Sequence, residues 1–193
     1  LAVLSARLPL DVARREEAPA RLDLDKLRGL LRARASWQDL HALWLHRADV
    51  ERVGGDRDSA RRAYETALVL GRKRELANGP VLLQLASLHL EGGDLASARA
   101  AVDEAVRLPP SGGMNAHETR ATRAVLQAEV ALREGSVVEA SSALQDAEIL
   151  VAQSPLDLPL LVESLRRARA VADPALGVRL EALARGMASM IEA

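Results

Sequence analysis

Apolar residues recur along most of this chain at spacings of three and four residues. One such series is Leu82, Leu85 and Leu88, and another is Val125, Ala128 and Leu132. This spacing places the apolar side chains on one face of an α-helix. The pattern predicts helices over residues 25–35, 36–53, 59–74, 81–91, 95–107, 116–134, 137–152, 160–172 and 175–191.

Three turns between these predicted helices share one register. Gly54-Gly55-Asp56 and Gly92-Gly93-Asp94 are close copies, and Gly135-Ser136 is a weaker one. Glycine permits the left-handed backbone that ends a helix, and Asp is favoured at the start of the next helix. At equal distances after each turn come a small, a bulky and a second small residue: Ala60, Tyr64 and Ala67; Ala98, Val102 and Ala105; Ala140, Leu144 and Ala147. The small residues allow two helices to approach closely, and the bulky residue fills the gap to a neighbour.

Composition strengthens the helical prediction and narrows the chemistry. Ala, Leu and Arg dominate, while the chain has no Phe, one Tyr and two Trp, a mixture that favours helix over sheet. Cysteine is absent, which excludes disulfides, thiolate nucleophiles and Cys-ligated metals. The net charge of −1, without a concentrated basic face, argues against a nucleic-acid partner.

The repeated helical pairs resemble the tetratricopeptide repeat family. The second copy carries the family pattern most fully, in the residues Leu82, Leu85, Ala86, Gly93, Asp94, Ala98, Val102, Ala105 and Pro110. The first copy supplies the family's Trp as Trp44 and its aromatic residue as Tyr64, but departs from the pattern at Arg47 and Arg72. The third copy has the Ala positions without a Trp or Pro. The resemblance covers about residues 37–153.

The spacing of the turns departs from the usual repeat. Gly55 and Gly93 lie 38 residues apart, and Gly93 and Gly135 lie 42 apart, whereas the usual unit has about 34 residues. The extra residues include Asn78-Gly79-Pro80 and the stretch 109–113. This spacing resembles the extended variant of the repeat found in bacterial signalling proteins.

The resemblance implies an all-α fold of antiparallel helical hairpins stacked as a short right-handed α-solenoid. We expect residues 1–35 to form an N-terminal arm and a capping helix, with residues 1–21 irregular or briefly helical. We expect residues 36–153 to form three tetratricopeptide-like pairs, with Ser36 capping the first helix of the first pair. We expect residues 154–193 to form a degenerate fourth pair or a C-terminal cap.

The sequence carries none of the residue patterns that are typical of catalytic or metal sites. His41 and His46 are five residues apart and do not share a helical face as a metal-binding pair would. The Gly-Gly-Asp turns lack the Gly-Lys-Ser/Thr ending of a phosphate-binding loop. We therefore expect no enzyme activity, no cofactor and no metal.

A solenoid of this family has a concave face lined by the first helix of each pair. The resemblance places nine residues on that face as candidate contacts for a partner: Leu45, Asp49, Arg52, Leu83, Ser87, Glu91, Val125, Glu129 and Arg133. Such a groove suits an amphipathic helix or an extended peptide, although Leu45, Leu83 and Val125 are equally expected to pack only against neighbouring helices. The basic clamp with which some family members hold chaperone tails is missing, because Leu45, Asp49, Leu83 and Ser87 stand in its place.

The sequence thus indicates a protein-interaction module, a scaffold or adaptor that binds a helix or peptide of another protein. It suits the regulatory part of a larger signalling protein. Self-association is the alternative, because residues 1–75 carry +4 (16 − 12) and residues 76–193 carry −5 (10 − 15), and because Met187–Ile191 is apolar. A helical ligand-binding domain is a third and weaker interpretation.

The distribution of apolar residues also bears on where in the cell the protein is expected. No stretch is long and apolar enough for a membrane span, so membrane insertion is not expected. Residues 1–10 are apolar but lack a basic start, and a signal peptide is not indicated. We expect a cytoplasmic location.

Overall fold

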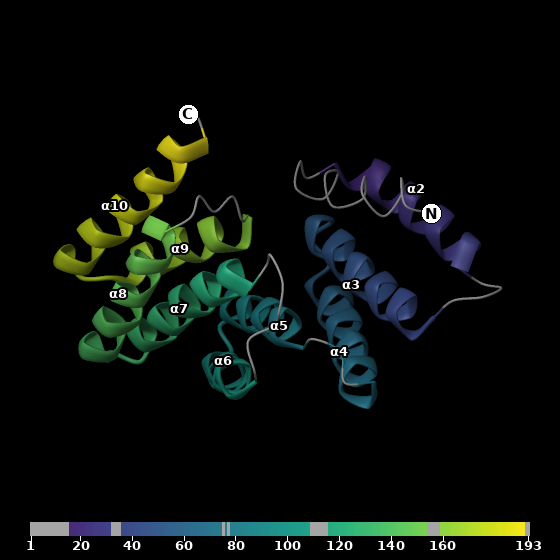
Figure 1. The fold of residues 1–193 in the computed structure, drawn as a ribbon, viewed down its shortest axis with the longest axis horizontal. Coiled ribbons are helices and arrows are strands. Elements are labelled where there is room, and N and C mark those ends of the chain that lie inside the picture. The colour runs from purple at the N-terminus through teal and green to yellow at the C-terminus, as the bar shows by residue number, and fades with distance from the viewer. Residues whose placement is uncertain are drawn as a thin grey trace. The chain divides into compact units, whose positions relative to one another are not determined.

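The computed structural model describes residues 16–31, 36–74, 76, 78–108, 116–153 and 159–191. Within these residues the chain forms α-helices and no β-strand, as Figure 1 shows. The helices are α2 (Glu17–Leu31), α3 (Trp37–Val53), α4 (Arg57–Lys73), α5 (Gly79–Gly92), α6 (Leu95–Arg107), α7 (Ala116–Arg133), α8 (Val137–Gln153), α9 (Pro159–Val171) and α10 (Pro174–Ile191). The predicted all-α class is confirmed. No helix in the described ranges combines the length and apolarity that a membrane crossing requires.

The chain divides into two compact units, Leu1–Val81 and Leu82–Ala193. In the first unit, α3 packs against both α2 and α4. Arg21 of α2 donates a hydrogen bond of 2.8 Å to Glu51 of α3, and Ala20 packs against Val50. These contacts hold α2 against the first helical pair.

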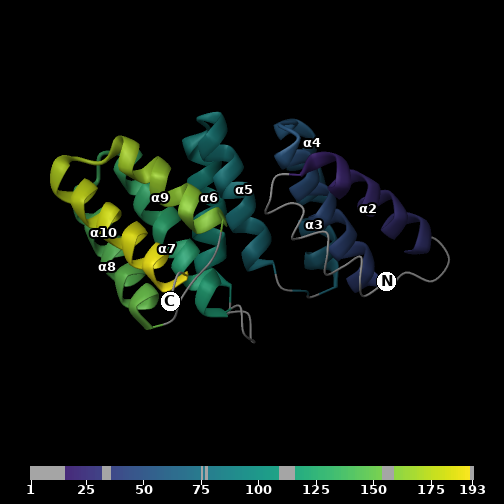
Figure 2. The ribbon, with the colours of Figure 1, turned by 90° about the horizontal axis from the view of Figure 1, so that it is seen from above.

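In the second unit, the helices α7, α8, α9 and α10 each pack against more than one other helix. α7 packs against α6, α8 and α9, and α10 packs against both α8 and α9. Figure 2 shows the α7–α10 group from a second direction. First helices thus meet first helices, and second helices meet second helices, in the last two pairs.

The three glycine turns have one geometry. Gly55, Gly93 and Gly135 have φ values of 82°, 79° and 79°, which is the left-handed region that glycine adopts without strain. In each turn, the next residue's N–H reaches the carbonyl five residues back: Asp56 to Glu51 at 2.9 Å, Asp94 to His89 at 2.9 Å, and Ser136 to Ala131 at 2.8 Å. This is the hydrogen bond that closes a helix C-terminus, and the predicted left-handed turns are confirmed.

The helix starts are capped by side chains. Asp56 accepts from Ser59 N–H at 2.9 Å, and Asp94 accepts from Ser97 N–H at 3.1 Å. Ser36 caps α3 as predicted: its hydroxyl accepts from Asp39 N–H, and the Asp39 carboxylate accepts from Ser36 N–H in return. Each cap satisfies a backbone N–H that has no partner inside its helix.

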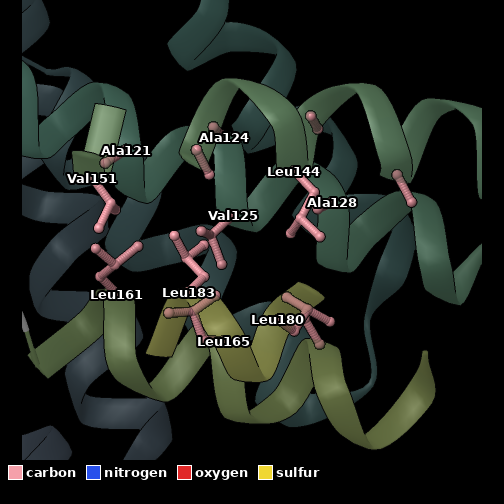
Figure 3. Packing of buried hydrophobic residues seen from close by; sticks show 14 of the residues in the cluster. Ala121, Ala124, Val125, Ala128, Leu144, Val151, Leu161, Leu165, Leu180 and Leu183 are labelled. Carbon is pink, nitrogen blue, oxygen red and sulfur yellow. The ribbon is translucent and has the colours of Figure 1, made fainter. Parts of the chain in front are cut away.

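The residues that follow each turn are buried in the register that the sequence predicted. None of the nine is more than 5% exposed: Ala60, Tyr64, Ala67, Ala98, Val102, Ala105, Ala140, Leu144 and Ala147. In the second unit, Ala and Leu side chains of α7 and α8 continue into a core with Leu161, Leu165, Leu180 and Leu183 of α9 and α10, which Figure 3 shows from close by. Small side chains on α7 bring its neighbours close, and the leucines fill the space between them.

Three helices start two or more residues before their predicted starts. One is α4, which begins at Arg57 rather than at residue 59, with Asp56 as its cap. α2 begins at Glu17 rather than Asp25, so part of the predicted arm is helical, while residues 1–15 and 32–35 lie outside the described range. α5 begins at Gly79, two residues before the predicted start, because Pro80 lies in the first turn, where its missing N–H breaks no bond. Residues 109–113 also lie outside the described range.

Candidate functional site

The nine candidate contact residues fall into two groups. Leu45, Asp49 and Arg52 lie on α3 in the first unit, and the other six lie on α5 and α7 in the second unit. Each group is described within its own unit.

In the first unit, Asp49 bonds within its own helical pair. The buried Tyr64 hydroxyl on α4 donates a hydrogen bond to its carboxylate. Burial raises the pKa of Asp49 to about 6, against the opposing effects of the Tyr64 hydrogen bond and the charge of Arg52. Leu45 and Arg52 are partly buried. Asp49 therefore fastens α3 to α4, and partly exposed side chains lie one turn on either side of it.

In the second unit, the predicted apolar residues are buried. Leu83 is 2% exposed and Val125 is fully buried. Val125 belongs to the core that contains Leu161 and Leu165 of α9, and Figure 3 shows these leucines facing it. The face of α7 that contains Val125 is thus covered by a later helix of the same chain.

The predicted polar residues of the second unit gather around one side chain, Arg167 of α9. Its Nε and Nη2 donate to the two carboxylate oxygens of Glu129 at 3.0 and 3.1 Å. Nη2 also donates to Ser87 Oγ at 3.0 Å and to Ser164 Oγ at 3.2 Å, and Nη1 lies 3.5 Å from Glu91 Oε1. These five residues form what we term the Arg167 cluster, which links α5, α7 and α9.

Glu129 is the buried centre of this cluster. Its side chain has no exposed area, and that of Arg167 is 13% exposed. A buried carboxylate is costly unless cations and hydrogen-bond donors surround it. Arg133, one turn further along α7, provides a second cation, with Nη2 3.0 Å from Glu129 Oε1. The planar guanidinium of Arg167 matches the carboxylate with two parallel bonds, which a lysine cannot do.

The structure thus brings four of the candidate residues together, namely Ser87, Glu91, Glu129 and Arg133. It does so through a residue that the sequence reasoning missed. Asp49, Glu129 and Arg167 each lie four residues before the last residue of their helices. Counting back four residues from the end of α9 would have identified Arg167 as the residue equivalent to Glu129 in α7.

The carboxylates of the cluster contact guanidinium and hydroxyl groups. Glu129 contacts Arg167 and Arg133, and Glu91 contacts Arg167 and the Ser87 hydroxyl. Among the described residues, no group of three or more His, Asp or Glu side chains is placed to hold a metal ion. The expectation that the chain is not an enzyme stays a prediction.

Comparison with known proteins adds no family to this description. No protein-family model matches the chain, and no curated protein is significantly similar to it.

Proposed function

We propose that the chain is a tetratricopeptide-like interaction module that binds a helix or peptide segment of another protein. The observation that carries the proposal is the repeated pair. Three successive turns have the same left-handed glycine and the same closing hydrogen bond, and the small–bulky–small residues after them are buried in one register. Helical pairs that repeat in this way stack into solenoids, whose usual function is to present a long surface to a partner.

The surface that we propose for binding is formed by the first helix of each pair. In the second unit, first helices pack on first helices, as α7 does on α9, and second helices pack on second helices, as α8 does on α10. In a right-handed solenoid of this kind the first helices line the concave face. Arg133 and Glu91, which remain partly exposed, would contact the partner there, and Leu45 and Arg52 would do so in the first unit.

A peptide-display selection on the full chain tests this proposal. We expect the enriched peptides to converge on one motif, and their binding to weaken about tenfold or more when Arg52 or Arg133 is changed to Glu. Val138→Glu is the matched control, because Val138 on α8 is 83% exposed and lies on a second helix. Its peptide binding should be unchanged.

Two results would contradict the proposal. One is a selection that yields no convergent motif from several libraries. The other is a motif whose binding responds to Val138→Glu but not to Arg52→Glu or Arg133→Glu, which would place the binding surface on the second helices.

Self-association is the second candidate, and one observation favours it. α8 and α10 pack together, and they expose Val138 and Val178 by 83% and 65%. Light scattering across a range of concentrations tests it, with Val138→Glu as the variant. A dimer that this change dissociates would support self-association through α8, and a monomer at every concentration would exclude it.

A further inference from the structure

The strongest feature outside the predicted surface is the way in which α9 lies on α7. α9 is amphipathic: Leu161, Leu165 and Ala168 are at most 1% exposed and belong to the core, while Val162 is 48% exposed. Arg166, on the outer side, has a side chain that is 75% exposed. Arg167 lies at the edge of the buried side and is the one residue of α9 shown bonding to both α5 and α7. α9 thus has the form of a helical ligand with apolar anchors and one cation, Arg167, at the edge of its buried side.

We propose that the face of α5 and α7 beneath α9 is a receptor for an arginine-bearing helix, and that α9 is its resident occupant. A partner helix binds by displacing α9. Its motif is set by α9 itself, in which Leu161, Leu165 and Arg167 give the spacing Leu-x-x-x-Leu-x-Arg. This inference rests on the proposed function, and it names the partner's chemistry and the step that controls access.

The chemistry of the face selects arginine. Glu129 is fully buried, and an occupant without a cation would leave its charge poorly compensated. Ser87 Oγ and both oxygens of Glu129 accept from the one guanidinium edge of Arg167. The ammonium of a lysine is a point charge that cannot match this planar set of acceptors.

The face also carries the means of releasing α9. Arg133 pairs with Glu129 at 3.0 Å from within α7 itself, so the carboxylate keeps one cation when Arg167 withdraws. Ser87 Oγ lies 3.3 Å from Glu91 Oε1 and retains a hydrogen-bond partner on its own helix. The electrostatic part of the cost of releasing α9 is therefore lower than for a buried ion pair that has no other partners.

The test uses a labelled peptide of residues 159–171 and the full chain. Wild-type chain should bind the peptide weakly, because α9 already occupies the face. The variant Arg167→Glu repels Glu129 and frees the face, so we expect it to bind the peptide about tenfold more tightly, read by fluorescence polarisation. A peptide with Arg167→Lys should bind this variant about tenfold less tightly than the wild-type peptide does. The matched Arg166→Lys peptide should bind it like the wild-type peptide, because Arg166 lies on the exposed side.

Several results would overturn the inference. Failure of the folded Arg167→Glu chain to bind the peptide is one, and equal binding of the Arg166→Lys and Arg167→Lys peptides is another. If Arg167→Glu does not fold, as judged by circular dichroism, Arg167→Gln replaces it. If neither variant folds, α9 is an obligate part of the core and the inference fails.

The remaining outcomes separate this inference from the function on which it rests. A dimer of the wild-type chain in light scattering that Arg167→Glu abolishes would assign the face to a second copy, and would overturn the partner-helix version. Peptides selected by display that still bind through Arg133, while the 159–171 peptide does not bind, would refute the resident occupant and leave the proposed function standing.

Discussion

The phenolic hydroxyl of Tyr64 donates a hydrogen bond to the carboxylate of Asp49, joining the two helices of the first pair. Tyr64 is 1% exposed, so the bond lies in the interior of the hairpin. Burial raises the pKa of Asp49 from 3.8 to about 6. The same side chain that fastens α3 to α4 thus carries an electrostatic cost at neutral pH.

Asp49→Asn should stabilise the protein at neutral pH. The folded-state pKa exceeds the unfolded-state value, so the folded protein holds this proton more tightly. The resulting stability is complete below pH 3.8, falls as the pH rises, and is lost above pH about 6. One pKa unit corresponds to about 1.4 kcal/mol, so this loss is at most about 3 kcal/mol. Asn keeps an acceptor for Tyr64 and does not ionise.

Urea unfolding at several pH values measures this effect. The free energy of unfolding of the variant minus that of wild type should increase between pH 4 and pH 7. Asp58→Asn is the control for the loss of a surface carboxylate, since the Asp58 side chain is 78% exposed. A difference for Asp49→Asn that does not change with pH would contradict the raised pKa of Asp49.

Gly71→Ala should destabilise the first unit. A Cβ at Gly71 would lie 2.0 Å from Asn78 Oδ1 and 3.3 Å from His41 Nε2, and Gly71 is itself buried. The Asn78 side chain must move, at a cost of about 1–3 kcal/mol typical of overpacking. Gly177→Ala in α10 is the control, because its Cβ would meet nothing within 4 Å and Ala favours helix.

Thermal unfolding compares the two alanine variants. The midpoint should fall for Gly71→Ala and should hold or rise for Gly177→Ala. The double change Gly71→Ala with Asn78→Ala should recover most of the loss, because the clashing oxygen is removed. If it does not, the clash with Asn78 is not the cause.

Much of the fold could be predicted from the sequence because its signals are local. A glycine followed by Asp predicts both the end of one helix and the start of the next, as at Gly93 and Asp94. The glycine adopts the left-handed backbone that ends the first helix, and the Asp caps the second. The register after each turn follows from helical periodicity alone, which is why Ala98 and Val102 were correctly expected to be buried. At the third turn Ser136 stands in the place of Asp, and its N–H makes the same closing hydrogen bond.

The parts that could not be predicted depend on contacts distant in the chain. In α2, Arg21 bonds to Glu51 of α3, thirty residues later. The Arg167 cluster joins residues up to eighty positions apart, and the last pair turns at Asp173-Pro174 without the glycines that marked the other registers. Arg166 and Arg167 are adjacent and chemically identical, and only the position relative to the end of α9 distinguishes the nearly buried Arg167 from the exposed Arg166.

Gly93→Ala and Gly92→Ala should differ in sign although the residues are adjacent. Gly93 has a φ of 79°, where a Cβ costs about 1–2 kcal/mol, while Gly92 ends α5 and has no such φ. Neither Cβ would meet an atom within 4 Å, so crowding does not enter the comparison. Chemical denaturation should show Gly93→Ala destabilised and Gly92→Ala unchanged or slightly stabilised. Equal effects would show that the turn does not require the left-handed backbone.

Arg167→Ala should cost far more than Arg166→Ala. Removing the Arg167 guanidinium leaves the buried Glu129 with Arg133 as its remaining cation, and breaking a buried pair in this way costs about 3 kcal/mol. Arg166 has a 75% exposed side chain, and its loss should cost less than about 0.5 kcal/mol. The double change Arg167→Met with Glu129→Met removes both charges, and should be less destabilising than either single change. Urea unfolding of these variants distinguishes two models of the cluster. If the cost of each single change comes from an uncompensated buried charge, the double change will be the milder one. If the side chains only fill space, the free-energy losses of the two single changes will add.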